Sequence, residues 1–553
     1  MSIDRHWGLS ITPLSPVHLG SGQDYEPTGY VIDDGALHEF DGIAALQALP
    51  DQERAKLGRI LEGRPTQDML RQVQTFFHGN RERLIAVSRR CVRVNPSVEA
   101  FYKERVGKVV QREERGREVQ NRLEIERTAF NPCSGAPILP GSGIKGAIRT
   151  ALLDRENDGR ALPPGLKGDR GANLKLQQRL FQYRPGKFEL DPMRLIRISD
   201  AMANDPEATV TQVRFAVNRK KTEVRVGGKL VDSQAEQRGL YQLLECLSPL
   251  QARGFRAQLS IQATGGVASN HWPDANLRFD AQSIAAACNR FYLPALERER
   301  KRLRERGFLD DQWEDAIGTL LSGPLSQTLF ENRAFLLRVG RHSGAESVTL
   351  NGVRDIKIMK GKGEKPEYLN HAKTLWLAAD ERLAQRGLLP FGWLLLEIHG
   401  ADEEPATITF PQPIDDFDAW RADVAARREG LVADLAAARA RAAKAEQERL
   451  DAERAEAERA ERLAQMTDEA RKLESLRELF ARDRAANRKD KGGELAGCLA
   501  EALKEAEAGW QGQDCVELAD LALEIYGFIG WPASKKKRER QELVNRIRAK
   551  SGA

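Results

Sequence analysis

Residues 138–153 read ILPGSGIKGAIRTALL and hold three glycines in the pattern GxGxxG, with two cations one helical turn apart. The spaced apolar residues of GAIRTALL predict that a helix follows the glycines. A glycine turn before a helix gives an anion access to free backbone amides, and the helix dipole is positive at that end. The stretch is therefore a candidate anion site, with contacts expected from Gly141, Ser142, Gly143, Lys145 and Arg149.

Two familiar phosphate-binding patterns do not fit this stretch. A dinucleotide site needs a preceding strand and a parallel βαβ succession, but only APIL precedes the glycines and no such succession follows. A Walker loop needs Ser or Thr after the lysine, and Lys145 is followed by Gly146. Cations beside a positive helix end are unfavourable unless an anion neutralises them. We therefore expect phosphate from a polymer here; the alternative is two solvated cations on a structural turn.

Two further glycine loops carry possible cations. Residues 16–22 read PVHLGSG and residues 338–344 read RVGRHSG. Three small-residue loops with cations at their edges fit a surface that follows a phosphate backbone, although each alone is more often an ordinary turn. The contacts expected from these two loops come from His18, Gly20, Ser21, Gly22, Arg338, Arg341 and His342.

Composition narrows the class of protein. The 553 residues include 86 Lys and Arg against 81 Asp and Glu, so the position of the cations is more informative than the net charge. No stretch reaches the roughly 18 to 20 apolar residues of a membrane helix, and the start lacks a signal-peptide layout. We expect a cytoplasmic protein with no membrane partner. The six cysteines form no CxxC pair and the eight histidines no HExxH motif, so we expect no metal and no cofactor.

The patterns along the chain predict an α+β fold. Alternating apolar residues predict strands over residues 7–40 and 194–267, and helical periodicity covers 281–322. The order of strand, glycine loop, helix and strands occurs twice, which predicts two related α+β domains, 1–235 and 236–417.

The composition changes to Ala, Glu and Arg after about Asp418. Neither glycine nor proline lies between Gly430 and Gly492, which predicts a long helix over residues 418–485. Its apolar positions are mostly alanine, so we expect a solvated helix or a weak coiled coil. A small helical region, 486–553, follows and contains the basic run SKKKRERQ.

Two other segments are candidate nucleic-acid contacts. Residues 207–230 predict a strand pair whose tip is basic, a shape suited to entering between nucleotides while holding phosphates. An exposed polar hairpin is the alternative. The lysine-rich residues 357–373 form either a surface loop or a second RNA contact. The contacts expected from the hairpin are Arg214, Phe215, Arg219, Lys220 and Lys221.

Four stretches in order, HLGSGQDYEPTGYVID, PILPGSGIKGAIRTALL, RLIRISDA and PFGWLLLE, resemble the RAMP superfamily of CRISPR effector proteins. The resemblance spans approximately residues 7–402 and is greatest to the family of the fifth subunit of the type III-A (Csm) complex. That family has serine at the position of Gly143, so one hydroxyl contact is missing here. The tail after Asp418 has no counterpart in the family's usual form.

The resemblance implies two ferredoxin-like (RRM-like) domains with glycine-rich loops. It also implies a non-catalytic RNA-binding subunit that caps the guide-RNA filament near the 3′ portion of the guide and supports guide maturation and assembly. The implied partners are guide RNA and the backbone and small subunits of the complex, with target RNA as a further candidate. By position, the loops at 18–22 and 141–149 fall on the family's RNA-contacting motifs.

Some RAMP proteins cut RNA, which leaves a catalytic alternative. Metal-free cleavage needs a general base and a general acid, and His18 beside the Lys145 motif is the candidate pair for processing guide precursors. Asp24 is the nearest candidate for metal-dependent cleavage of target RNA. We expect neither, because the resemblance assigns His18 to a non-cleaving subunit and Asp24 suits loop capping.

Overall fold

The computed structural model has an α+β fold in two compact units, Met1–Leu435 (unit 1) and Ala436–Ala553 (unit 2). No helix in the described part of the chain has the length and apolar character needed to cross a membrane. All six cysteines are free thiols. The structure describes residues 4–550 apart from 109–110, 113–117, 120–122, 167–168, 224, 227–228, 231–239, 265–270, 360–362, 401–402, 404, 406–407 and 414–416.

A seven-stranded sheet in unit 1 has the order β17, β22, β1, β16, β11, β9, with β10 also paired to β16. Its central strand β1 pairs antiparallel with both β16 and β22, so three distant parts of the chain meet there. The strands are β1 (Arg5–Pro13), β9 (Ile138–Leu139), β10 (Ile196–Ile198), β11 (Ala201–Ala203), β16 (Phe255–Ile261), β17 (Ala334–Arg338) and β22 (Trp393–Gly400).

A nine-stranded sheet has the order β2, β8, β15, β12, β5, β4, β3, with β20 paired to β12 and β21 to β20. Asp34 and Gly35 both have positive φ at the turn between β3 and β4, which form a hairpin within the region 7–40 predicted to contain strands. The strands are β2 (Gly20–Tyr25), β3 (Tyr30–Asp33), β4 (Ala36–Glu39), β5 (Arg90–Val94), β8 (Ile125–Thr128), β12 (Thr211–Lys220), β15 (Tyr241–Leu247), β20 (Thr374–Ala379) and β21 (Leu389–Pro390).

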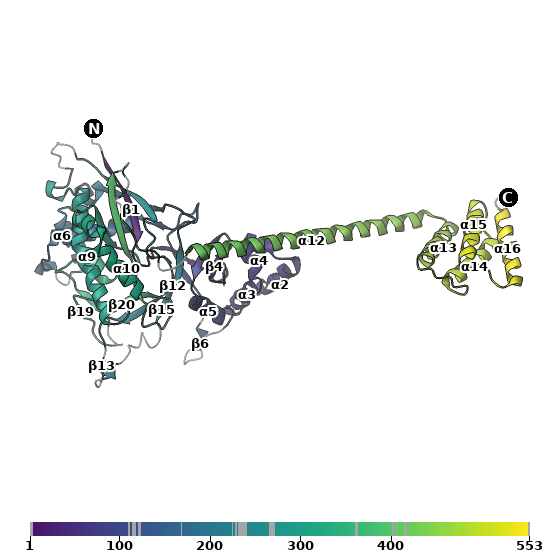
Figure 1. The fold of residues 1–553 in the computed structure, drawn as a ribbon, viewed down its shortest axis with the longest axis horizontal. Coiled ribbons are helices and arrows are strands. Elements are labelled where there is room, and N and C mark those ends of the chain that lie inside the picture. The colour runs from purple at the N-terminus through teal and green to yellow at the C-terminus, as the bar shows by residue number, and fades with distance from the viewer. Residues whose placement is uncertain are drawn as a thin grey trace. The chain divides into compact units, whose positions relative to one another are not determined.

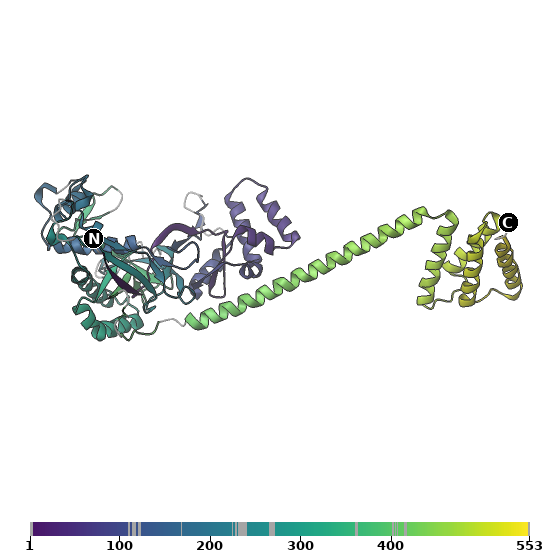
Figure 2. The same cartoon turned by 90° about the horizontal axis from the view of Figure 1, so that it is seen from above.

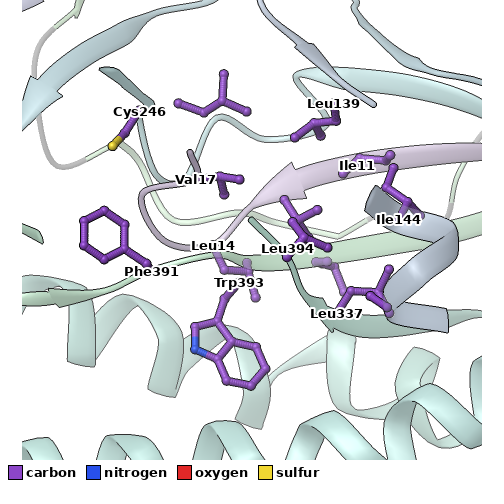
Figure 3. Packing of buried hydrophobic residues seen from close by; sticks show 14 of the residues in the cluster. Ile11, Leu14, Val17, Leu139, Ile144, Cys246, Leu337, Phe391, Trp393 and Leu394 are labelled. Atoms are coloured by element: carbon purple, nitrogen blue, oxygen red, sulfur yellow. The ribbon is translucent and has the colours of Figure 1, made fainter. Parts of the chain in front are cut away.

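Helices α6 (Gly141–Asn157) and α9 (Ala281–Glu305) pack against each other and against the seven-stranded sheet (Figure 1). Ile144 of α6 enters the same buried core as Ile11 of β1 and Leu337 of β17 (Figure 3). The apolar side of the glycine motif thus anchors α6 to the sheet.

Helices α1 to α4 follow β4 and precede β5 in the sequence, and they pack together as a smaller group (Figure 2). This group has its own apolar core, against which Leu431 also packs. The first turns of α12 (Phe417–Gln465) are fixed there because Trp420 Nε1 donates a 3.1 Å hydrogen bond to the Gly35 carbonyl. The helices of the group are α1 (Gly42–Ala48), α2 (Asp51–Leu61), α3 (Gln67–Gly79) and α4 (Arg81–Ala86).

The remaining elements of unit 1 are short. They are helices α5 (Pro96–Arg105), α7 (Ala172–Leu180), α10 (Asp311–Ser322) and α11 (Pro324–Phe330), and three two-stranded ribbons. The ribbons pair β6 (Gln111–Arg112) with β7 (Glu118–Val119), β13 (Arg225–Val226) with β14 (Lys229–Leu230), and β18 (Ile356–Ile358) with β19 (Glu367–Leu369). The lysine-rich segment 357–373 includes the last ribbon, and its residues 360–362 lie outside the described part.

The sheets do not follow the expected division at residues 235 and 236. β12 pairs with β15 across this position, and β1 pairs with strands from the later part of the chain. Each sheet is therefore built from both halves of the sequence. The reason is that strands of the two sheets alternate along the chain, so a repeated order of elements does not mark consecutive domains.

The prediction of an exposed hairpin over residues 207–230 is wrong for the first strand of that hairpin. Thr211–Lys220 is an inner strand, β12, whose first nine residues are all buried. Phe215 packs edge-to-face on Phe101 and Tyr241. Arg219 is fully buried because backbone carbonyls at Asn218, Arg382 and Ala384 accept its guanidinium hydrogen bonds. These bonds let a strand rich in cations lie in a core.

Unit 2 contains the second part of α12 and a four-helix group with its own apolar core. The predicted long helix is confirmed over Phe417–Gln465, but its expected end at 485 is wrong. Thr467 caps a new helix by accepting a 3.2 Å hydrogen bond from the Ala470 amide, so the chain turns into the helical group. The helices of the group are α13 (Asp468–Ala485), α14 (Glu494–Ala508), α15 (Gln513–Ile529) and α16 (Ser534–Ala549).

Candidate nucleic-acid interface

The glycine motif forms the first turns of α6 itself, rather than a loop before it. Helix α6 begins at Gly141, whose amide donates a 2.8 Å hydrogen bond to the Asp200 carboxylate. A Cβ at Gly141 would overlap the backbone oxygens of Ile198 and Ser199. Gly141 therefore lets the helix start against the sheet, and the anion at that amide is a carboxylate of the chain itself.

Arg149 is held by a network inside unit 1. Its guanidinium contacts the Asp191 carboxylate at 3.0 Å, donates a 3.0 Å hydrogen bond to Gln177 and lies over the ring of Phe181. Its side chain is 25% exposed. The expectation that only an external phosphate could neutralise the cations of this motif is therefore wrong for Arg149, because Asp191 does so.

Lys145 differs from Arg149. In the described residues its ammonium group has no ion-pair partner, and its side chain is half-buried. Partial burial lowers the pKa of Lys145, with Asp191 opposing the shift and Arg149 adding to it. The preceding motif residue Ser142 is exposed. Lys145 is thus the motif cation available to an external anion.

The two glycine loops, 16–22 and 338–344, and the glycine motif at the start of α6 meet in the structure, and together they are called the three-loop cluster. The Arg341 amide donates a 2.9 Å hydrogen bond to the His18 carbonyl, which joins the first loop to the third. Gly340 has φ of +80°, and a Cβ there would overlap the same carbonyl. Gly143 of the helix motif lies against the first loop, because a Cβ added at Gly143 would be only 3.2 Å from the Leu19 side chain. The three segments that the sequence analysis identified separately as candidate phosphate contacts therefore form one cluster.

Small and polar residues of the first loop face outward. Gly20 and Gly22 are exposed, and Gly22 has φ of +77° with open space where a side chain would begin. The Ser21 hydroxyl donates a 3.1 Å hydrogen bond to the Arg127 carbonyl, which fixes the loop to β8. The pairing of β2 with β8 shifts in register between Gly20 and Asp24, so the strand bulges at this point.

His18 is buried inside this cluster rather than displayed by it. Its side chain is fully buried, and its Nδ1 lies 2.7 Å from the Glu245 carbonyl oxygen. Its Nε2 has no hydrogen-bond partner among the described residues and lies 3.9 Å from the Glu126 carboxylate. Burial lowers the pKa of His18, which favours a neutral ring. His18 therefore shapes the loop and does not present a cation.

Arg341 supplies a cation at the edge of the cluster. Its side chain is 43% exposed and its guanidinium lies 2.6 Å from the Glu126 carboxylate. Burial raises the pKa of Glu126, while Arg341 opposes that shift. Asp24 is exposed on β2, opposite Glu126 in the strand pairing. No group of three His, Cys, Asp or Glu residues suited to a metal ion occurs in the described ranges.

Other expected contacts lie inside unit 1. Arg338 is buried, donates hydrogen bonds to Glu299 and the Phe391 carbonyl, and lies over Trp393. His342 stacks on Trp376 with ring centroids 4.6 Å apart, and burial lowers its pKa to about 4. Both side chains of this loop therefore have their partners within unit 1.

The residues expected on the hairpin are likewise engaged in the protein. Arg214 donates a 2.6 Å hydrogen bond to Asp380, and Lys221 pairs with Glu346. The Lys220 carbonyl accepts a 3.4 Å hydrogen bond from Arg306. The side chains of Arg214 and Lys221, like buried Phe215 and Arg219, therefore have their partners inside unit 1.

Sequence reasoning missed the carboxylates that organise the cluster. Glu245 is fully buried on β15 and accepts hydrogen bonds from Tyr25, the Thr128 amide and Thr211, besides pairing with Arg90. Asp191 and Asp200 were missed in the same way. The signal for Asp200 was its place directly after the strand RLIRIS, but nothing local in the sequence links Glu245 to its partners.

Comparison with known proteins agrees with this fold. The model of the RAMP superfamily matches residues 10–321, which is more than half of the chain. The chain belongs to the RAMP superfamily. No curated protein sequence matches it.

Two solved structures are similar to this chain over most of its length. One is a chain in the cryo-EM structure of a Csm-crRNA-target RNA ternary complex of a type III-A CRISPR-Cas system, with 16% identity, 72% of this chain and 100% of that chain covered, and a TM-score of 0.39. The other is the crystal structure of T. onnurineus Csm5, with 16% identity, 70% and 99% covered, and a TM-score of 0.38.

Proposed function

We propose that this chain is a non-catalytic RNA-binding subunit of a type III CRISPR effector complex. It binds guide RNA through the cluster of three loops, near the 3′ portion of the guide, and supports guide maturation and assembly. The observation that carries the proposal is the convergence of the three loops, which puts exposed Gly20, Gly22 and Ser142 together with Lys145 and Arg341. Glycines allow a phosphate backbone to approach closely, and the two cations supply charge.

The finer assignment rests on membership of the RAMP superfamily and on the four sequence stretches that resemble the type III-A fifth subunit. In this assignment the fold consists of two ferredoxin-like halves. The partners are guide RNA and the backbone and small subunits of the complex, with target RNA as a further candidate. The location is cytoplasmic. The alternating strands of the two sheets require that such halves be interleaved along the chain.

A single cation tests the proposal. Lys145→Ala should weaken binding of a labelled guide RNA about 3- to 10-fold and reduce the slope of log K against log salt by roughly 0.7, the value for one phosphate contact with a single strand. Lys175→Ala is the matched control, because Lys175 is exposed on α7 and pairs with Asp169. Equal guide affinity for the wild type and both variants would contradict the proposal.

One observation favours the cleaving alternative: the Nε2 of His18 has no hydrogen-bond partner among the described residues and lies beside Glu126. Burial of that ring argues against contact with RNA. Cutting of a repeat-containing RNA by the purified chain, abolished in His18→Asn, would support the nuclease. We expect no cutting by either protein.

A further inference from the structure

Two basic segments of unit 2 lie side by side. Residues 484–491 contain four basic residues and one acidic residue, and residues 535–540 contain five basic residues and one acidic residue. The Lys491 ammonium group in the first segment donates a 3.3 Å hydrogen bond to the Trp531 carbonyl, just before the second segment. The fold of the four-helix group thus concentrates cations from two separate stretches.

Aromatic rings hold these cations in place. Lys489 Nζ lies 5.6 Å from the ring centroid of Phe528, and Lys537 Nζ lies 5.9 Å from that of Trp531. Both rings are half-buried, and Trp531 stacks on buried Tyr526 at 4.6 Å. We call Lys489, Lys491, Phe528, Trp531 and Lys537 the lysine–aromatic surface. Its lysines are exposed, and its rings pack against the apolar core of the helical group.

Carboxylates do not neutralise this surface. Within the described part of unit 2, Lys489, Lys491 and Lys537 form no ion pair, and the nearby Asp490 uses its Oδ1 to accept a hydrogen bond from the Gly492 amide. The neighbouring Arg538 is 89% exposed, with the Glu542 carboxylate 4.0 Å away.

Several other cations of the same unit are paired. Arg477 contacts Glu517 at 2.7 Å, Arg546 contacts Glu507 at 2.8 Å, and Lys472 pairs with Glu505. Unpaired cations gathered on one surface repel each other, and a polyanion removes that cost. The contrast indicates that the lysine–aromatic surface has a ligand outside the chain.

We propose that the lysine–aromatic surface is a second nucleic-acid site, which binds the phosphate backbone without reading sequence. Lys489 and Lys537 lie over the rings and so occupy them, which leaves ammonium groups rather than ring faces for the ligand. Ammonium groups are point charges that bind phosphate irrespective of the base. The site lies outside residues 10–321, where the RAMP family matches, and does not depend on the three-loop cluster.

Charge removal tests the site in the full chain. The test protein carries Lys145→Ala to weaken the loop cluster, and the added changes are Lys489→Gln, Lys491→Gln and Lys537→Gln. The probe is a labelled 20-residue polyuridylate, read by fluorescence anisotropy over a salt series. We expect about 5- to 10-fold weaker binding and a salt slope smaller by roughly 2, because three single-strand phosphate contacts each contribute about 0.7.

The matched control removes the same charge from paired cations, with Lys472→Gln, Arg477→Gln and Arg546→Gln. Urea unfolding of both triple variants confirms that unit 2 remains folded. The control should bind the probe as the parent does. Equal affinity and slope for the parent and the lysine–aromatic variant would overturn the proposal. Loss of polyglutamate binding with RNA binding unchanged would assign the surface to an acidic protein and overturn it too. Failure of Lys145→Ala alone to weaken guide binding would affect only the proposed function.

Discussion

The backbone amide of Arg341 donates a 2.9 Å hydrogen bond to the carbonyl oxygen of His18, so the first and third glycine loops form one structure. This bond requires the close approach of Gly340, which has a positive φ and faces the same carbonyl. The loop cluster therefore depends on a backbone contact between two distant segments of unit 1. Its cations can act together only while that contact holds.

Gly340→Ala should disrupt this contact. The new Cβ would meet the His18 carbonyl at a positive φ, so we expect a loss of at least about 3 kcal/mol in the free energy of unfolding and weaker guide binding. Gly135→Ala is the control, since Gly135 has φ of +71° but open space around it and should cost only about 1–2 kcal/mol. Urea titration measures both. Equal losses would show that contact with His18 contributes nothing.

Substitutions of Arg149 and Lys145 should have different effects. Arg149→Ala should lower stability, whereas Lys145→Ala should weaken guide binding with little change in stability. Removal of Arg149 leaves the partly buried Asp191 without its cation, so Arg149→Ala should lower the free energy of unfolding by about 2–3 kcal/mol. Lys145→Ala should change it by less than about 0.5 kcal/mol, because Lys145 has no carboxylate partner in the described residues. Thermal or urea unfolding measures the two variants. A stable Arg149→Ala protein would contradict the structural role of that ion pair.

The stability of unit 1 should fall on acidification. His38 is buried, and burial together with the Arg427 cation lowers its pKa from 6.5 to about 4. Below pH 6.5 the unfolded chain takes up a proton that the folded chain refuses, so stability is full above 6.5 and declines as pH falls towards 4.

His38→Gln should abolish the contribution of this histidine to the pH dependence, because glutamine takes up no proton on unfolding. The slope of unfolding free energy against pH between 4.5 and 6 should therefore decrease by up to roughly 1.4 kcal/mol per pH unit. The measurement is a series of urea unfolding curves at several pH values. A slope that is the same in variant and parent would show that His38 does not titrate differently on folding.

The helical group of unit 2 should unfold as a separate transition. Leu518 is fully buried in its own core, so Leu518→Ala should destabilise unit 2 by about 2–5 kcal/mol. Differential scanning calorimetry should show one transition lowered and the transition of unit 1 unchanged. A single transition that shifts as a whole would indicate that the two units unfold together.

Local patterns predicted the elements better than their arrangement. Alternation identified the strand region that contains β1, β3 and β4, and periodicity identified α6 and α9. The alternating use of strands by two sheets could not be predicted, because strand pairing depends on contacts between distant segments. A local signal for the start of α13 was present, since Thr467 precedes two acidic residues in the usual manner of a helix cap, but the surrounding alanines favoured one continuous helix.

Part of the candidate site was predictable for a similar reason. The glycine loops and Lys145 stand out in the sequence, whereas the partners that neutralise Arg149 and Arg338 do not, because Asp191 and Glu299 approach them only in the folded chain. The cations of β12 were misjudged because charge in a strand normally indicates exposure. Backbone carbonyls around Arg219 satisfy that charge in the core.

Ultraviolet crosslinking of the full chain to a copurified guide RNA, followed by mass spectrometry of the crosslinked peptides, shows directly whether the three-loop cluster binds the guide. We predict crosslinks in peptides that contain residues 18–22, Ser142 to Lys145 and Arg341, towards the 3′ portion of the guide. Crosslinks confined to other surfaces of unit 1, with none in the three loops, would contradict it.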